Sequence, residues 1–174
     1  MRSRAVAAER FRYQDGMMRK RLTKFHYEPP GGEPERHWID IEQIATVEVT
    51  SEDPEFPIDR VFGSTSLIGW RASEPGGQQI RLIFDVPLSV HRIKLCFHEA
   101  ELERTQEFTI RWSSGSGPMR EIVRQQWNFS PTGSTTEVED YFVNLDSVSV
   151  LELALRPDLG GRDVVATLAS FRLG

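Results

Sequence analysis

Three segments of this chain place apolar residues at every second position. The alternation runs through residues 80–86 (IRLIFDV), 92–98 (RIKLCFH) and 108–112 (FTIRW). Successive side chains of a β-strand point to opposite faces of a sheet, so each segment would bury one face and expose the other. A second layer must cover the buried faces. The pattern therefore predicts an all-β fold, an antiparallel β-sandwich.

Shorter segments on either side extend this pattern to about eight main strands. A breaker-rich stretch that includes Pro87 would join the strands of residues 80–86 and 92–98. Residues 57–63 would form one helical turn, and residues 64–77 a long polar loop that holds Trp70 and Arg71. The other expected strands lie at residues 38–41, 45–50, 120–129, 141–143, 151–155 and 169–173.

The charge is distributed unevenly along the 174 residues. Residues 1–24 hold eight Lys or Arg and two acids, a net +6, so the rest carries −11 in a chain of net charge −5. Such an acidic body is a poor match for phosphate, which argues against nucleic acid as a partner. We divide the chain into a basic, partly irregular N-terminal arm (residues 1–37) and a binding domain (residues 38–174). The arm would be solvated, or would pair with the acidic body of its own or a neighbouring subunit.

The single cysteine, Cys96, excludes an intrachain disulfide and is interpreted as a reduced structural thiol. The N-terminus lacks the apolar stretch of a secretory signal, and no apolar run is long enough to cross a bilayer. We therefore expect a cytoplasmic protein without a membrane partner.

No motif in the chain indicates catalysis. There is no Gly-x-Ser-x-Gly or His-Glu-x-x-His sequence, and the glycine-rich residues 114–117 join two strands as a turn. Cys96 and His98 precede three glutamates within residues 99–103, but a solvated strand end explains this group better than a metal site. We expect no enzyme, no cofactor and no metal.

Five short motifs, in this order, resemble the discoidin or coagulation-factor type C superfamily, the galactose-binding-domain-like jelly rolls. They are residues 50–52 (TSE), 57–63 (PIDRVFG), 69–73 (GWRAS), 109–115 (TIRWSSG) and 166–174 (ATLASFRLG). The resemblance covers residues 45–174. It implies a jelly-roll sandwich that binds carbohydrate through loops at one end.

The chain departs from that superfamily at two positions that help hold a structural calcium ion. Gly63 follows Phe62 where many members have an acid, and Ser170 stands in place of a glutamate. Calcium prefers carboxylates among six to eight oxygen ligands. We therefore do not expect this chain to have the structural calcium site of that superfamily, although Asp59 could contribute one ligand.

The candidate ligand-binding residues are Arg71, which is favoured, and Trp70, Asp59, His98 and Arg111. An indole can stack on the apolar face of a sugar while an arginine bonds its hydroxyl groups. Trp70 could instead close the end of the sandwich, and this interpretation is preferred. Two functions stay open: a non-catalytic carbohydrate-binding module, or a protein-interaction or homo-oligomerisation module without a small-molecule ligand.

Overall fold

The computed structural model describes residues 38–63 and 69–174, which lie within one compact unit. The predicted basic arm lies outside the described residues, so the division at residue 37 stays a prediction. The unit contains a short 3-10 helix η1 (Ile41–Gln43), a helical turn α1 (Arg60–Gly63) and the strands β1 (Ala45–Val49), β2 (Trp70–Pro75), β3 (Gln78–His98), β4 (Arg104–Ser113), β5 (Arg120–Phe129), β6 (Thr136–Arg156), β7 (Val165–Leu168) and β8 (Ser170–Leu173).

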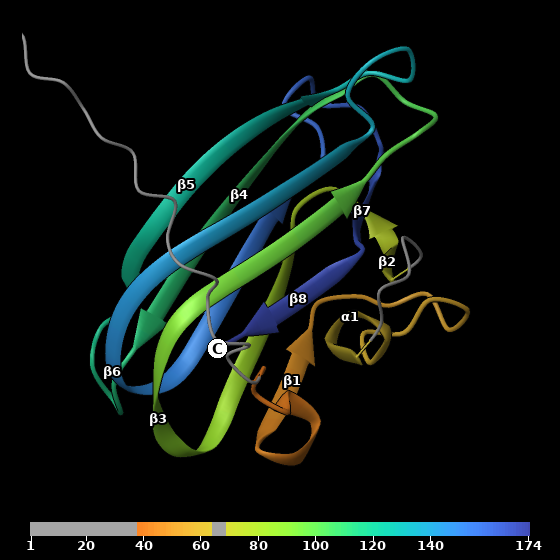
Figure 1. Cartoon of the computed structure of the whole chain (residues 1–174). Coiled ribbons are helices and arrows are strands. Elements are labelled where there is room, and N and C mark those ends of the chain that lie inside the picture. Colours follow the sequence, from red (N-terminus) through yellow and green to blue (C-terminus); the bar gives the residue numbers. More distant parts are fainter. Residues whose placement is uncertain (1–37, 64–68) are drawn as a thin grey trace, which may run out of the picture. The chain divides into compact units, whose positions relative to one another are not determined.

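The strands form two layers that share β3 and β6 (Figure 1). The five-stranded layer, which lies farther from the viewer in Figure 1 and is called the front layer throughout, has the order β1, first half of β3, second half of β6, β4, β5; in it Ile80 lies opposite Leu153. The layer nearer the viewer in Figure 1, called the back layer, contains β8, the second half of β3 and the first half of β6; in it Phe97 lies opposite Glu137. A separate antiparallel pair, β2 and β7, lies beside them. All pairings are antiparallel, which confirms the predicted sandwich.

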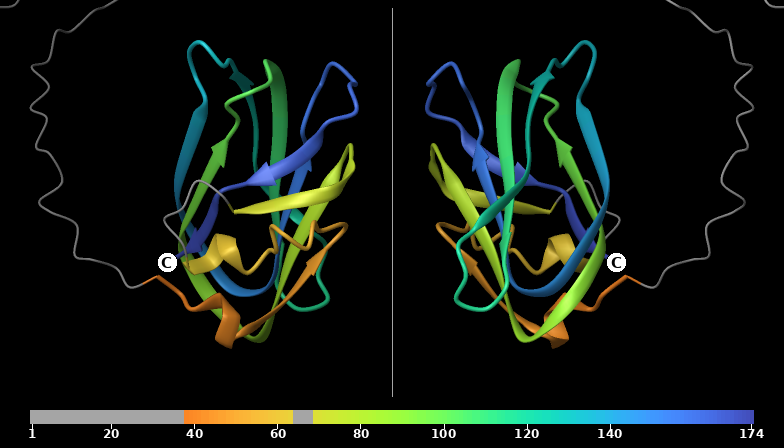
Figure 2. Two further views of the ribbon diagram at one scale, coloured as in Figure 1. Left: turned by 90° about the vertical axis from the view of Figure 1, so that its right-hand side faces the viewer. Right: turned by 90° about the vertical axis from the view of Figure 1, so that its left-hand side faces the viewer.

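Both long strands bend where they pass from one layer to the other. In β3 the register to β6 shifts between Ile83 and Arg92, and the side chain of Val86 in this bend is 73% exposed. In β6 the bend contains Ser147 in the left-handed conformation, with φ 57°. Figure 2 shows the layers joined by these curved strands. The two pairs of strands expected on either side of the bends are therefore two continuous strands.

The core lies between the layers and is built from the alternation seen in the sequence. Ile80 and Leu82 of the front layer and Leu95 of the back layer are fully buried. Across the core, the rings of Phe97 and Phe108 stack with centroids 5.2 Å apart. Burial of such apolar surface is the main favourable contribution to the free energy of folding.

Two other sequence expectations were wrong, and one strand was not expected. Residues 38–41 form no strand, because the chain turns through η1 at Ile41. Part of the expected loop at residues 64–77 is β2, which begins at Trp70. The strand expected at residues 169–173 is confirmed as β8, which pairs with β3. Strand β7, which pairs with β2, was not expected, and between the two strands the N–H of Ala169 bonds to the carbonyl of Cys96.

A ladder of alternating charge crosses the outer face of the front layer. Each of the five strands contributes one charged residue, and these residues lie in register across the sheet in the order Glu48, Arg81, Glu152, Arg111 and Glu121. Arg81 Nη1 lies 3.1 Å from Glu48 Oε2, and Arg81 Nε lies 3.7 Å from Glu152 Oε2. Opposite charges in directly opposed positions stabilise neighbouring strands.

The first half of β6 is the edge of the back layer and turns acidic side chains inward. Glu137 is 1% exposed, and neither carboxylate oxygen has a hydrogen-bond partner among the described residues. Burial, and then the neighbouring Glu139 carboxylate, raise the pKa of Glu137 to about 8. The carboxyl group of Glu137 is therefore mostly protonated and uncharged at neutral pH in the folded protein. Its buried oxygens, which lack a hydrogen-bond partner among the described residues, cost folding free energy.

We predict that Glu137→Gln stabilises the protein in a pH-dependent way. The folded-state pKa of about 8 lies above the ordinary glutamate pKa of 4.5, so the wild type loses stability as pH rises between these values and not beyond. Urea unfolding from pH 5 to 9 should show the advantage of the variant growing up to about pH 8 and then levelling off. Glu42→Gln, at an exposed site, is the control. An advantage that does not change with pH would contradict the prediction.

Candidate binding site

The loop between β1 and α1 is bonded to the edge of β2. The N–H of Asp53 donates to the carbonyl of Arg71 at 2.9 Å, and the N–H of Arg71 donates to the carbonyl of Phe56 at 3.1 Å. On its other side, Arg71 lies in register with Thr167 of β7. Arg71 is therefore held by backbone contacts on both sides, at a sheet edge that the loop covers.

The side chain of Arg71 is fixed by an ion pair and an aromatic ring. Its Nε and Nη2 atoms both donate to Asp53 Oδ2, the former at 3.0 Å. Its guanidinium carbon lies 4.0 Å from the centroid of the Phe56 ring, within the range of a cation–π contact. Arg60 approaches the same ring at 5.6 Å. We call Asp53, Phe56, Arg60 and Arg71 the loop cluster.

The loop cluster presents donors and acceptors to solvent. The Arg71 side chain is 40% exposed and that of Asp53 is 22% exposed. Hydrogen bonds from Arg71 and from the Glu55 N–H hold the pKa of Asp53 below its usual value, so its carboxylate is ionised at neutral pH. A planar donor group thus lies beside a carboxylate acceptor, an arrangement that suits neighbouring hydroxyl groups.

Trp70 belongs to the core and not to the loop cluster. It is 1% exposed and lies opposite Leu168 in the β2–β7 pair. Its indole Nε1 has no hydrogen-bond partner among the described residues. The preferred interpretation from the sequence, an aromatic that closes the end of the sandwich, agrees with this burial. The indole has no exposed face on which a ligand could stack.

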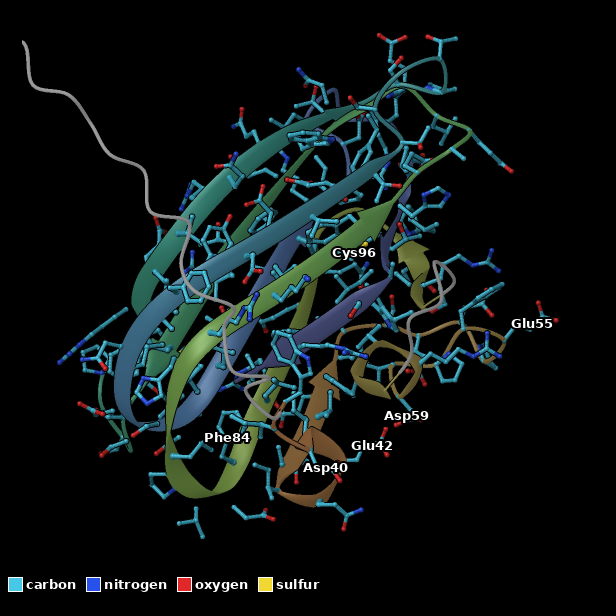
Figure 3. The ribbon with its side chains drawn as sticks, in the orientation of Figure 1. Asp40, Glu42, Glu55, Asp59, Phe84 and Cys96 are labelled. Atoms are coloured by element: carbon cyan, nitrogen blue, oxygen red, sulfur yellow. The ribbon has the colours of Figure 1, made fainter. Side chains whose placement is uncertain are left out.

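Asp59 is exposed at the start of α1, six residues along the chain from Asp53. Figure 3 shows Asp59 and Glu55 projecting away from the strands on the side of this loop. The loop itself is held by Glu52, whose Oε2 accepts a hydrogen bond of 2.6 Å from the N–H of Ile58. Asp59 is thus available for contact at the border of the loop cluster.

His98 ends β3 and connects to Arg71 through one residue. Its carbonyl accepts a hydrogen bond of 3.4 Å from Thr167 Oγ1, and Thr167 is the register partner of Arg71. The His98 ring contacts Thr136 Oγ1 through Nδ1 at 3.0 Å. The structure therefore brings Arg71 and His98 to the same end of the sandwich.

Arg111 lies elsewhere, on the outer face of the front layer. Its Nη1 is 3.5 Å from Glu152 Oε1, and the Glu152 side chain is only 8% exposed. Arg111 is part of the charge ladder, so the structure separates it from the loop cluster and gives it a stabilising role.

A shallow hollow of about 560 Å³ lies on β1 and β3. Its lining includes Thr50, Gln79 and the ion pair of Glu48 and Arg81. Thr50 also donates to Gln78 Oε1 at 2.6 Å, which ties the end of β1 to the start of β3. None of the loop-cluster residues lines this hollow. It adds a polar surface beside the loop but no enclosed pocket.

Within residues 38–63 and 69–174, no group of three or more His, Cys, Asp or Glu side chains could hold a metal ion. The same residues contain no helix long and apolar enough to cross a membrane.

The sequence analysis missed Asp53 and Phe56, the two residues that orient Arg71. Phe56 stands between Pro54 and Pro57, outside any strand pattern, in an otherwise polar stretch. An aromatic residue in a polar loop was the available signal. The contact to Arg71 could not be foreseen, because it depends on how the loop runs along β2.

The fold is that of known carbohydrate-binding modules. The family 32 module of NanJ from C. perfringens, solved with galactose, has a TM-score of 0.57 and 13% identity, covering 78% of this chain and 96% of that one. The CBM32 module of AlyQ, solved with 4,5-unsaturated mannuronic acid, has a TM-score of 0.57 and 17% identity, covering 80% and 98%. A pectin-binding module has a TM-score of 0.55 and 16% identity, covering 76% and 91%.

These similarities confirm the jelly-roll fold that the sequence motifs implied. No family model matches the sequence. No curated protein matches it either. The likeness thus lies in the path of the backbone, and identities of 13–17% carry no residue roles from those modules to this chain.

We predict that Gly69→Ala destabilises the protein while Gly63→Ala does not. A Cβ at Gly69 would lie 2.2 Å from the carbonyl oxygen of Leu168, so β2 would have to move off β7. Overpacking of this kind costs about 1–3 kcal/mol. A Cβ at Gly63 would meet no atom of residues 38–63 and 69–174 within 4 Å. Thermal unfolding checks this prediction, and equal melting temperatures of the two variants would refute it.

Proposed function

We propose that this chain is a non-catalytic carbohydrate-binding module that holds a sugar at the loop cluster. The observation that carries the proposal is the Arg71–Asp53 pair, a donor and an acceptor held side by side on the Phe56 ring. Sugar hydroxyl groups both donate and accept hydrogen bonds, so two neighbouring hydroxyls can bond to both partners of the pair.

The cluster is organised before a ligand binds. Arg71 is fixed by two hydrogen bonds to Asp53 and by the ring of Phe56 at 4.0 Å. Ordering a free arginine on binding would cost side-chain entropy, and that cost is reduced here. In this proposal, His98 and Asp59 would extend the contacts to a second sugar residue. The solved modules of similar fold that bind galactose, an unsaturated mannuronic acid and pectin support a glycan ligand.

The absence of catalysis is part of the proposal. Glycoside hydrolysis commonly uses two carboxyl groups that flank the scissile bond. The ionised Asp53 of the cluster is engaged by Arg71, so in the proposal it acts as a hydrogen-bond acceptor and not as one of such a pair.

Self-association without a small ligand is the alternative that the sequence left open. The exposed apolar side chains that could support self-association are Phe142 and Val138 on β6, which are 60% and 56% exposed. Light scattering of the full chain tests it: a mass that stays monomeric at high protein concentration removes this alternative.

We predict that Arg71→Ala weakens the binding of neutral glycans at the loop cluster without unfolding the protein. A glycan array covering galactosides, N-acetylgalactosaminides and uronates would identify the ligand of the wild type. Loss of a charge-assisted contact should weaken binding at least about tenfold. Arg124→Ala, at an exposed arginine paired with Glu121 on the front face, is the matched control. No glycan binding by the wild type, or binding of neutral glycans that is equal in Arg71→Ala, would overturn the proposal.

A further inference from the structure

The outer face of the back layer carries a compact group of charged and aromatic side chains. Arg172 of β8, Lys94 of β3 and Asp140 of β6 lie side by side in register. Arg92 and Phe142 form the adjacent pair along β3 and β6. We call these five residues the back-face patch.

Arg92 and Asp140 form the rigid part of the patch. Arg92 donates to both carboxylate oxygens of Asp140, through Nε at 2.8 Å and Nη2 at 2.7 Å. Its guanidinium lies 4.9 Å from the ring centroid of Phe142 and 5.2 Å from that of Trp38. The bond from Arg92 holds the pKa of Asp140 below its usual value. The one carboxylate of the patch is therefore already engaged.

Lys94 and Arg172 have no carboxylate partner of this kind. They are opposed in the β3–β8 register, and no ion pair is formed by either of them within residues 38–63 and 69–174. Arg172 contacts the Trp38 ring at 5.7 Å. Like charges placed directly opposite each other destabilise a sheet. An anion between them would relieve this repulsion.

Apolar surface adjoins these two cations. Phe142 is 60% exposed and Val138 is 56% exposed, and both lie on the outer side of β6. Phe142 is a diagonal neighbour of Lys94, at a separation of about 7 Å between side-chain positions. A single sugar residue with its carboxylate spans such a distance.

We propose that the back-face patch is a second glycan site that takes a carboxylated sugar, a uronate residue of an acidic polysaccharide. The carboxylate would lie between Lys94 and Arg172, and the flat apolar face of the pyranose would pack on Phe142. The proposal rests on the proposed function only in taking the ligand to be a glycan. It uses none of the loop-cluster residues.

The patch favours a uronate over other anions because one residue of that polymer combines an anionic group with an apolar ring face. A peptide needs two residues for the same contacts. The positive charge of residues 1–24, a net +6, makes the chain's own N-terminal segment a poor occupant. The patch carries three cations and one carboxylate, in contrast to the −11 of the chain from residue 25 onward.

The test compares oligogalacturonate with the same oligomer fully methyl-esterified, titrated into the full chain by calorimetry. The double variant Lys94→Gln/Arg172→Gln should bind oligogalacturonate about tenfold more weakly. Phe142→Ser should also weaken it, and the neutral ester should bind the wild type more weakly than the acid does. Added salt should lower the affinity for the acid only.

The matched controls change the same charge and apolar surface elsewhere. Arg124→Gln/Arg156→Gln removes two positive charges from the front layer, and Val86→Ser removes an exposed apolar side chain from the bend. Both controls should bind oligogalacturonate like the wild type. Melting temperatures equal to that of the wild type show that each variant is folded.

Four results would overturn this inference. If the wild-type protein binds neutral glycans but not oligogalacturonate, the back-face patch is not a uronate site. The proposed function at the loop cluster is unaffected by that result. Uronate binding that is lost in Arg71→Ala and kept in Lys94→Gln/Arg172→Gln belongs to the loop cluster. Equal competition by polyglutamate identifies an acidic peptide as the occupant. A dimer that Phe142→Ser dissociates identifies a second copy of the chain.

Discussion

Two 21-residue strands, β3 and β6, each belong to both layers of the sandwich, and the remaining strands take their places from them. Each strand must bend to pass from one layer to the other, and each bend interrupts the ladder between them. Beyond the bends, the alternation of side chains still directs one face of each layer into a common core. The path of β3 then ends at His98, beside β7, and so determines which loops meet at that end of the molecule.

The polar residues are used in two different ways. On the front layer, Glu152 is almost buried between Arg81 and Arg111, so its charge is compensated within the sheet. At the loop cluster and the back-face patch, cations stay partly exposed and are oriented by aromatic rings, Phe56 in one case and Phe142 in the other. A compensated ladder stabilises the fold, whereas exposed and oriented cations are suited to ligands. This difference separates Arg111 from Arg71, although both are arginines of strands.

The sequence predicted most of the fold, because burial of one face imposes a period of two on each strand. It also predicted the burial of Trp70 as the preferred interpretation. It did not predict that β3 runs on through Pro87, since a proline normally ends a strand and is tolerated here only in an exposed bend. For the proposed site, Arg71, Asp59 and His98 were selected from residue type and position, and their role in binding stays a prediction. Asp53 and Phe56 were missed, because their contacts to Arg71 arise only when the loop bonds to the edge of β2.

The most direct test of the central claim, that the loop cluster binds a sugar, is amide chemical-shift mapping by NMR. The full chain, labelled with nitrogen-15, would be titrated with the glycan that binds best. The account predicts that the largest shifts fall on the amides of the non-proline residues within 53–59 and of Arg71 and Ala72. Shifts confined to the front layer around Arg111, or saturable binding that leaves the amides of Asp53, Phe56 and Arg71 unchanged, would contradict it.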